Sequence, residues 1–139
     1  MVMDREIRTE DLAWLAESLS KDEYHKTTTP EFFIQPNTVC KIYEDEDGPI
    51  LAVRGSIDFK RSKDAGSKSL RLDIQYKDNL DHRRNMKAMI TGFDILAKRS
   101  KENGFFEIVF DTNSPLLRKF CIRRLGFEEL DEFQLRKVL

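Results

Sequence analysis

The spacing of hydrophobic residues changes several times along this chain, and each change marks the boundary of a predicted element. Apolar residues recur every three or four positions over residues 12–19 and again over residues 86–97, which predicts two amphipathic helices. Residues 70–76 alternate between apolar and polar types, so we expect a half-buried strand there. Residues 105–110 are apolar except at Glu107, which predicts a strand that is covered on both faces.

Cap and turn residues complete this first map of the chain. Two apolar runs at residues 39–43 and 49–53 flank an acidic segment that ends in glycine, which predicts a β-hairpin. Ser114 and Pro115 are typical of the first turn of a helix, and this third helix is expected to end before Gly126. We also expect a first strand at residues 2–8 and an N-cap at Thr9 for the first helix. A polar connection is expected at residues 20–29, a charged loop at residues 58–69, and one or two closing strands at residues 127–139.

The predicted elements follow the order β, α, β, β, β, α, β, α, β, with room for one more short helix and one more closing strand. The early hairpin implies antiparallel pairing, whereas two β-α-β connections late in the chain imply some parallel pairing. We therefore expect an α/β (mixed α+β) fold with a mixed, mostly antiparallel central sheet of about six to seven strands, flanked by about four helices. A chain of 139 residues has the size of one domain, so a single domain over residues 1–139 is predicted.

The charge balance and the cysteine count exclude several function classes. Lys and Arg number 24 and Asp and Glu number 25, so no bulk field draws the protein to nucleic acid or to a membrane surface. The apolar runs are too short to cross a bilayer, and the first residues do not resemble a signal peptide. Cys40 and Cys121 lack the short spacing of metal ligands and fit a reducing compartment. We expect a cytoplasmic protein with no metal, nucleic-acid or membrane partner.

The last third of the chain carries the residues that relate it to a known family. A buried strand, Asn113, a helix with a basic face and the pair Gly126-Phe127 follow one another, after a long helix that begins near Arg83. This order resembles that of the GNAT N-acetyltransferase superfamily, of which the chain would be a divergent member, and the resemblance covers nearly the whole sequence. It implies the mixed fold described above, binding of acetyl-CoA, and transfer of an acetyl group to a primary amine of a small molecule or protein.

The resemblance places the cofactor loop at the start of the long helix. In the family, backbone amides there receive the pyrophosphate of acetyl-CoA, because a helix N-terminus offers unpaired donors and the positive end of a dipole. Arg83 and Ala88 match the family pattern, whereas Met86 stands where the family has glycine, and its side chain would crowd the pyrophosphate. The alternative is that Met86 simply begins the apolar stripe of the helix. The implied cofactor-binding residues of this loop are Arg83, Arg84, Asn85, Met86, Lys87 and Ala88.

Further roles follow from the same resemblance. A backbone amide at the end of the fourth strand would polarise the thioester carbonyl, and the residues concerned are Ile74, Gln75 and Tyr76. Asn113 would contact the cofactor, or it would serve only as a helix cap or turn residue. The tyrosine that often protonates the leaving thiolate in the family falls on Phe120 or Ile122, so its hydroxyl is missing here.

The acceptor side of the site is less well defined by the sequence. A general base must take a proton from the ammonium form of the acceptor, and we expect Asp73 in this role. The alternative is a surface aspartate that pairs with Arg71 or with a lysine. Tyr24 and His25 lie in the connection that commonly lines the acceptor site in the family; the alternative is a polar loop with one packed aromatic ring. The sequence does not identify the acceptor.

Two function classes therefore stay open. The first is an acetyl-CoA-dependent N-acetyltransferase. The second is a catalytically degenerate GNAT fold that serves as a structural, virion-associated or regulatory binding module, which Met86 and the missing tyrosine favour. An exposed sheet edge that pairs with a second copy would give a homodimer.

Overall fold

The computed structural model describes residues 1–23, 25–64, 66–78 and 81–139. The described residues form these helices and strands: β1 (Met3–Glu6), α1 (Asp11–Lys21), the 3-10 helix η1 (Pro30–Ile34), β2 (Val39–Asp45), β3 (Gly48–Asp58), β4 (Lys68–Tyr76), α2 (His82–Glu102), β5 (Phe105–Asp111), α3 (Pro115–Arg124), β6 (Glu128–Glu129) and β7 (Gln134–Val138). The predicted hairpin, the two amphipathic helices and the buried strand are all present.

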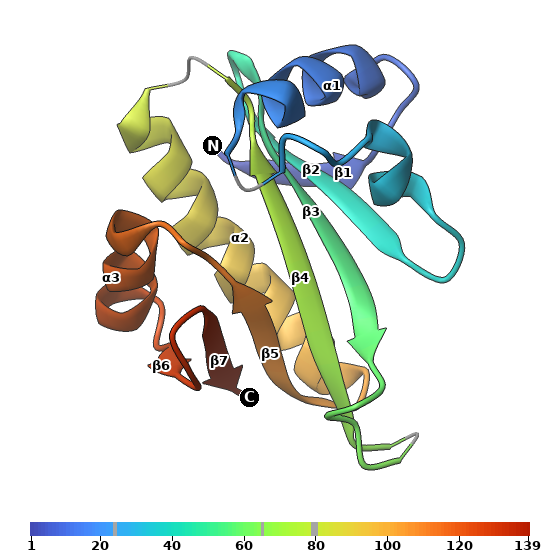
Figure 1. The fold of residues 1–139 in the computed structure, drawn as a ribbon, viewed down its shortest axis with the longest axis vertical. Coiled ribbons are helices and arrows are strands. Elements are labelled where there is room, and N and C mark those ends of the chain that lie inside the picture. Colours follow the sequence, from blue (N-terminus) through green and yellow to red (C-terminus); the bar gives the residue numbers. More distant parts are fainter. Residues whose placement is uncertain (24, 65, 79–80) are drawn as a thin grey trace. The chain divides into compact units, whose positions relative to one another are not determined.

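The strands form one seven-stranded sheet in the order β1-β2-β3-β4-β5-β7-β6 (Figure 1). β1 pairs with β2, β5 with β7 and β6 with β7 in antiparallel orientation, whereas β4 and β5 are parallel and are joined through α2. The prediction of a mixed, mostly antiparallel sheet of six to seven strands is therefore confirmed. Among the described residues, three α-helices and η1 make up the helices that accompany it.

The second β-α-β connection is present in the structure. β5 and β6 are each antiparallel to β7, which lies between them, so β6 runs parallel to β5 after the passage through α3. The prediction of Thr9 as the N-cap of α1 is wrong: Glu10 takes that position without a side-chain hydrogen bond, and the carboxylate of Asp11 accepts the Arg8 amide.

The chain divides into two compact units. Unit 1 comprises Met1–Arg54 and Ile74–Gly92, and unit 2 comprises Gly55–Asp73 and Phe93–Leu139. β3, β4 and α2 each contribute residues to both units.

The core of unit 1 follows the alternation of strand β2. Cys40 and Ile42 are buried on one face of β2, together with apolar side chains from α1, η1 and β3: Leu15, Leu19, Phe33 and Ala52. Tyr43 lies on the opposite face, and its hydroxyl donates to the carbonyl oxygen of Gly92 in α2 at 3.3 Å. A Cβ atom at Gly92 would lie 2.8 Å from the Tyr43 ring, so only glycine allows this approach of α2 to β2.

The core of unit 2 contains three aromatic rings in mutual contact. Phe93, Phe110 and Phe127 have ring centroids that are 5.2 to 6.3 Å apart. Gly126 has φ +78°, a left-handed conformation that ends α3, and the Phe127 amide donates to the carbonyl of Cys121. The Gly-Phe pair therefore turns the chain so that the phenylalanine enters the core.

The carboxylate of Asp11 joins β1 to the first turn of α1. Arg5 donates two hydrogen bonds to it, at 2.8 and 3.0 Å, and the Arg8 amide and Trp14 Nε1 donate two more, at 2.8 and 2.9 Å. The residue is 1% exposed. Burial alone would raise the pKa of Asp11, but the hydrogen bonds from Arg5 and Trp14 outweigh burial and lower the pKa to about 2.

The stability of the protein should fall as the pH drops from about 4 to about 2, because the pKa of Asp11 is lowered only in the folded state. The contribution is complete above the unfolded-state value near ~3.9 and amounts to about 2 to 3 kcal/mol. Urea unfolding of Asp11→Asn should show a lower free energy of unfolding at neutral pH and a flatter dependence on pH in this interval. Asp94→Asn, at an exposed position of α2, is the control. Parallel pH curves for the wild type and Asp11→Asn would contradict this assignment.

Candidate functional site

The connection between β4 and α2 is fixed where it leaves β4. The Lys77 amide donates to the carbonyl oxygen of Ile50 in β3 at 2.8 Å. The Asp78 amide donates to Ser18 Oγ at 2.9 Å, and the Asp78 carboxylate accepts from Lys21 Nζ at 2.8 Å, both on α1. Elements from the first half of the chain therefore hold the end of β4 in place.

The first turn of α2 is capped by Asp81. The Oδ1 atom of Asp81 accepts the Arg83 amide at 2.8 Å, and its carbonyl oxygen accepts the amides of Arg84 and Asn85 at 3.0 and 3.3 Å. An anionic oxygen thus already occupies this helix N-terminus, where unpaired amides and the helix dipole favour negative charge. An aspartate directly before a helix is a recognisable cap signal in the sequence.

Arg84 ties the same turn to the β2–β3 hairpin. Its guanidinium donates to both carboxylate oxygens of Asp45, at 2.7 and 2.8 Å, and to the carbonyl oxygen of Gly48 at 3.3 Å. The hydrogen bond from Arg84 lowers the pKa of Asp45, and the same bond raises the pKa of Arg84. The side chain of Arg84 therefore holds the helix in position, and only its backbone amide faces the cap.

The other predicted loop residues have different environments. The side chains of Arg83 and Lys87 are exposed, whereas Ala88 is buried at 1% exposure. Met86 is half-buried and lies one turn before the buried Met89. Asn85 is half-buried, and among the described residues its Oδ1 atom has no hydrogen-bond partner.

The structure brings His25 and Gln75 together, although they lie far apart in the sequence. His25 Nδ1 and Gln75 Oε1 are 2.9 Å apart, and both residues are buried. Gln75 Nε2 donates to the carbonyl oxygen of Tyr76 at 2.8 Å, and Ile74 is half-buried beside them in β4. Tyr24, the other predicted acceptor residue, lies outside the described residues.

The predicted residues of unit 2 lie on and after the strands β4 and β5. Asp73 is half-buried in β4, and its neighbour Arg71 donates to Asp111 at 2.6 Å. Asn113 is exposed, and it is not the N-cap of α3, because Ser114 takes that position and accepts the Leu117 amide. On α3, Phe120 is half-buried and Ile122 is exposed.

The two cysteines carry buried thiols. Cys40 and Cys121 are both free, and burial raises the pKa of each thiol to about 12. Both thiols are therefore protonated at neutral pH, which excludes them as nucleophiles.

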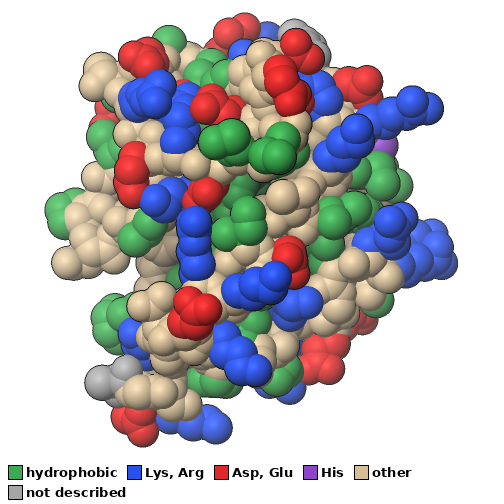
Figure 2. All heavy atoms as spheres, turned by 180° about the vertical axis from the view of Figure 1, so that it is seen from behind, with side chains coloured by type: hydrophobic (Ala, Val, Ile, Leu, Met, Phe, Trp, Pro, Cys, Tyr) green, Lys and Arg blue, Asp and Glu red, His purple; other side chains and the backbone are tan. Residues whose placement is uncertain are grey.

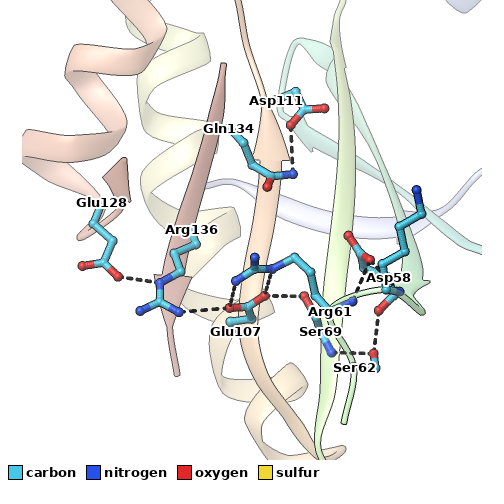
Figure 3. Close-up of polar contacts among 10 residues, drawn as sticks. Asp58, Arg61, Ser62, Ser69, Glu107, Asp111, Glu128, Gln134 and Arg136 are labelled. Atoms are coloured by element: carbon cyan, nitrogen blue, oxygen red, sulfur yellow. Dashed lines mark hydrogen bonds and ion pairs between the residues drawn. The ribbon is translucent and has the colours of Figure 1, made fainter. Parts of the chain in front are cut away.

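The buried carboxylate of Glu107 lies at the centre of a polar cluster in unit 2 (Figure 3). Arg61 donates two hydrogen bonds to the fully buried side chain of Glu107, at 2.6 and 2.8 Å. Ser69 Oγ donates another at 2.6 Å, and Arg136 donates at 3.4 Å. Burial alone would raise the pKa of Glu107, but the hydrogen bonds from Arg61 and Ser69 outweigh burial and lower it.

This cluster anchors the connection between β3 and β4. The Asp58 side chain accepts the amides of Lys60 and Arg61, and Ser62 Oγ donates to the Asp58 carbonyl and accepts the Ser69 amide (Figure 3). The donors and acceptors of this cluster thus form hydrogen bonds with one another, and we assign the cluster a structural role. The signal in the sequence was the single charge at Glu107 inside an apolar run.

One face of the molecule carries side chains of both charges. On the face drawn in Figure 2, basic and acidic side chains are interspersed with apolar ones. No helix in the described ranges is long and apolar enough to span a membrane. In those same ranges, no three His, Cys, Asp or Glu side chains are grouped so that they could hold a metal ion.

Comparison with known proteins relates the chain to acetyltransferases through its fold. No protein-family model matches the sequence, and a comparison with curated proteins finds no matching sequence. Aminoglycoside 6′-acetyltransferase type Ii matches with a TM-score of 0.67 at 14% identity over 98% of this chain and 96% of that chain. The N-acetyltransferase from Staphylococcus aureus Mu50 matches with a TM-score of 0.69 at 10% identity, over 99% and 97%.

A third match is AAC(6')-Ib in complex with ribostamycin and coenzyme A, with a TM-score of 0.67 at 17% identity over 99% of this chain and 93% of that chain. The chain therefore has the fold of the GNAT-type N-acetyltransferases, as the sequence resemblance implied. At these sequence identities the similarity establishes the fold alone, and an activity has to be inferred from the residues of the site.

Replacing Glu107 by glutamine should destabilise the protein by about 3 to 5 kcal/mol, because Arg61 and Arg136 lose a buried counter-charge. The matched control is Glu128→Gln, which removes an exposed partner of the same Arg136 and should cost less than about 1 kcal/mol. Chemical unfolding of the three proteins measures both values. Equal losses for the two variants would contradict the anchoring role of Glu107.

Proposed function

We propose that this protein binds acetyl-CoA at the first turn of α2 and transfers the acetyl group to a primary amine. The observation that carries the proposal is the fold match with N-acetyltransferases over nearly the whole chain, one of them in complex with coenzyme A. α2 is the next element after β4, and its Arg83 amide already donates to a carboxylate oxygen of Asp81.

The residues of this turn suit a diphosphate. An oxygen of the diphosphate would replace the Asp81 carboxylate as the hydrogen-bond acceptor of the Arg83 amide, where the helix dipole favours an anion. The exposed side chains of Arg83 and Lys87 add positive charge beside it. Arg84 would stay on Asp45 and keep the helix in position while the ligand binds.

The chemistry of the proposed reaction needs little from the protein beyond positioning. Acetyl-CoA would supply an acetyl group activated as a thioester. A backbone amide at the end of β4 would donate to the carbonyl oxygen, and Asp73 would accept the proton that the amine loses as its nitrogen bonds to the carbonyl carbon and the carbon–sulfur bond breaks. Phe120 and Ile122 carry no hydroxyl, so the leaving thiolate would take its proton from water.

The acceptor class is a primary amine on a small molecule or a protein. AAC(6')-Ib was solved with ribostamycin, which makes ribostamycin a first amine to test here. The free, buried thiols of Cys40 and Cys121 support a reducing compartment such as the cytoplasm as the place of action.

A second candidate function is a binding module without catalysis. The capping carboxylate of Asp81 and the missing hydroxyl on α3 favour it, because each removes something that the transfer reaction would use. The two candidates differ in whether acetyl-CoA binds to the native protein.

Acetyl-CoA should raise the melting temperature of the wild-type protein, since a ligand that binds only the native state stabilises it. At a concentration about 100-fold above its dissociation constant the gain is about 2.7 kcal/mol, or roughly 10 °C for a chain of this size. Arg83→Glu should weaken binding at least about tenfold. Lys101→Glu, the same charge change in the last turn of α2, should bind as the wild type does. A wild-type melting curve that millimolar acetyl-CoA leaves unchanged would favour the binding module.

Asp81→Asn should tighten acetyl-CoA binding about three- to tenfold. The asparagine oxygen can still cap the Arg83 amide, while the repulsion between the carboxylate and a diphosphate, about 1 kcal/mol at 4 Å in water, is lost. Isothermal titration calorimetry measures the affinities, with Asp94→Asn as a control of equal charge change. Weaker or unaltered binding by Asp81→Asn would place the diphosphate elsewhere.

A further inference from the structure

A chain of two side-chain hydrogen bonds runs through unit 1 from the α1–η1 connection to the last residue of β4. His25 Nδ1 lies 2.9 Å from Gln75 Oε1, and Gln75 Nε2 lies 2.8 Å from the carbonyl oxygen of Tyr76. His25 is 7% exposed and Gln75 is 3% exposed. Polar side chains that are buried this deeply form hydrogen bonds, because each buried polar atom left without a partner costs free energy.

The direction of both hydrogen bonds follows from the carbonyl group of Tyr76. A carbonyl oxygen only accepts, so the atom of Gln75 that faces it must be the NH₂ group. The other atom of the amide, Oε1, then faces His25 and also only accepts. His25 must therefore carry a proton on Nδ1 and donate it to Gln75.

The backbone around His25 fixes the place of its ring. The His25 amide donates to the carbonyl of Asp22 at 3.1 Å, and the Thr28 amide donates to the carbonyl of His25 at 2.8 Å. The ring of Phe33 stands edge-on to the imidazole at 84°, with 6.4 Å between the centroids. The imidazole thus acts as a fixed donor, placed by its own segment of chain.

The acceptor at the other end of this chain of bonds lies on a particular edge of β4. In a strand, the N–H and C=O groups of one residue point to the same edge, and those of the next residue to the opposite edge. The Lys77 amide donates to Ile50 in β3, so the N–H and C=O of Tyr76 point away from β3. Among the three residues that could polarise a thioester carbonyl, Tyr76 is the one whose carbonyl Gln75 holds.

We propose that His25 is a positioning residue: its Nδ1–H, acting through Gln75, orients the last peptides of β4 so that the Tyr76 amide points at the thioester carbonyl. This inference rests on the proposed binding of acetyl-CoA. Misplacement of a polarising donor by about an ångström can cost as much as about 100-fold in rate, so a second residue that fixes it has a measurable effect.

Two substitutions of His25 separate this role from others. His25→Asn keeps an N–H donor near the position of Nδ1 and loses Nε2, so it should preserve the bond to Gln75. His25→Leu removes the donor and leaves Gln75 Oε1 without it. Lys26→Ala, at an exposed neighbour in the same connection, is the control.

The decisive experiment uses acetyl-CoA labelled with ¹³C at the carbonyl and reads the carbonyl stretch of the bound thioester by infrared spectroscopy. We expect the wild type, His25→Asn and Lys26→Ala to shift the stretch to lower frequency by the same amount, because hydrogen bonding weakens the C=O bond. His25→Leu should lose most of the shift while acetyl-CoA still binds within about threefold of the wild type. An unaltered shift in His25→Leu, or a lost one in His25→Asn, would overturn the proposal.

A second measurement needs no cofactor. Nitrogen NMR of the imidazole at about pH 8, above the usual titration range of histidine, should show the proton of His25 on Nδ1. A proton on Nε2 would overturn the proposal whatever the protein binds. A wild-type protein that shows the Nδ1–H form but no affinity for acetyl-CoA would instead refute the proposed function and leave the hydrogen-bond chain as architecture.

Discussion

The amides that open α2 need acceptors, and in this molecule a single aspartate supplies them. Asp81 accepts one amide with its side chain and two with its carbonyl oxygen, at the point where the chain passes from β4 into the helix. This arrangement makes the turn a place where an anionic oxygen is stable. Under the proposed function, a phosphate ligand would compete with this carboxylate, which is part of the chain.

The elements around this turn are held by interactions that do not involve the Asp81 carboxylate. Arg84 attaches the helix to Asp45, and Lys77 and Asp78 attach the end of β4 to β3 and α1. Elsewhere, Asp11 and Glu107 are buried carboxylates with arginine partners, and each holds a connection between two elements. Such pairs contribute little net stability against an apolar replacement, but removal of one partner is costly, which makes them suited to fixing one conformation.

Periodicity predicted the elements well, because the spacing of apolar residues is a local property that burial imposes directly. The seven-stranded mixed sheet and the long helix before β5 agree with that prediction. The prediction of Thr9 as an N-cap was wrong, since Glu10 takes that position, and the spacing of apolar residues did not reveal the contacts of Asp11 with Arg5 and Trp14. The contact between His25 and Gln75 joins segments that the sequence separates widely, so only the fold could bring it to light.

The order of the elements also led to the right fold, although the residues that would bind a cofactor match the family only in part. Met86 is half-buried near the start of α2, and Asn113 is exposed directly before the Ser114 cap of α3; neither position assigns a function to the residue. What the structure adds is a physical reason to look at the amides of α2. Asp81 accepts three of these amides, and their direction depends on the backbone.

Amide-resolved NMR during a titration with coenzyme A tests the central claim most directly, since it reports on each N–H group of the turn. If a diphosphate replaces the Asp81 carboxylate, the amide signal of Arg83 will move most, because this amide changes its acceptor. The signals of Arg84 and Asn85, whose amides donate to the Asp81 carbonyl oxygen, will move less and saturate with it. If those three signals stay in place while coenzyme A is added in excess, the first turn of α2 is not a diphosphate site, and the exchange of a carboxylate for a phosphate does not take place there.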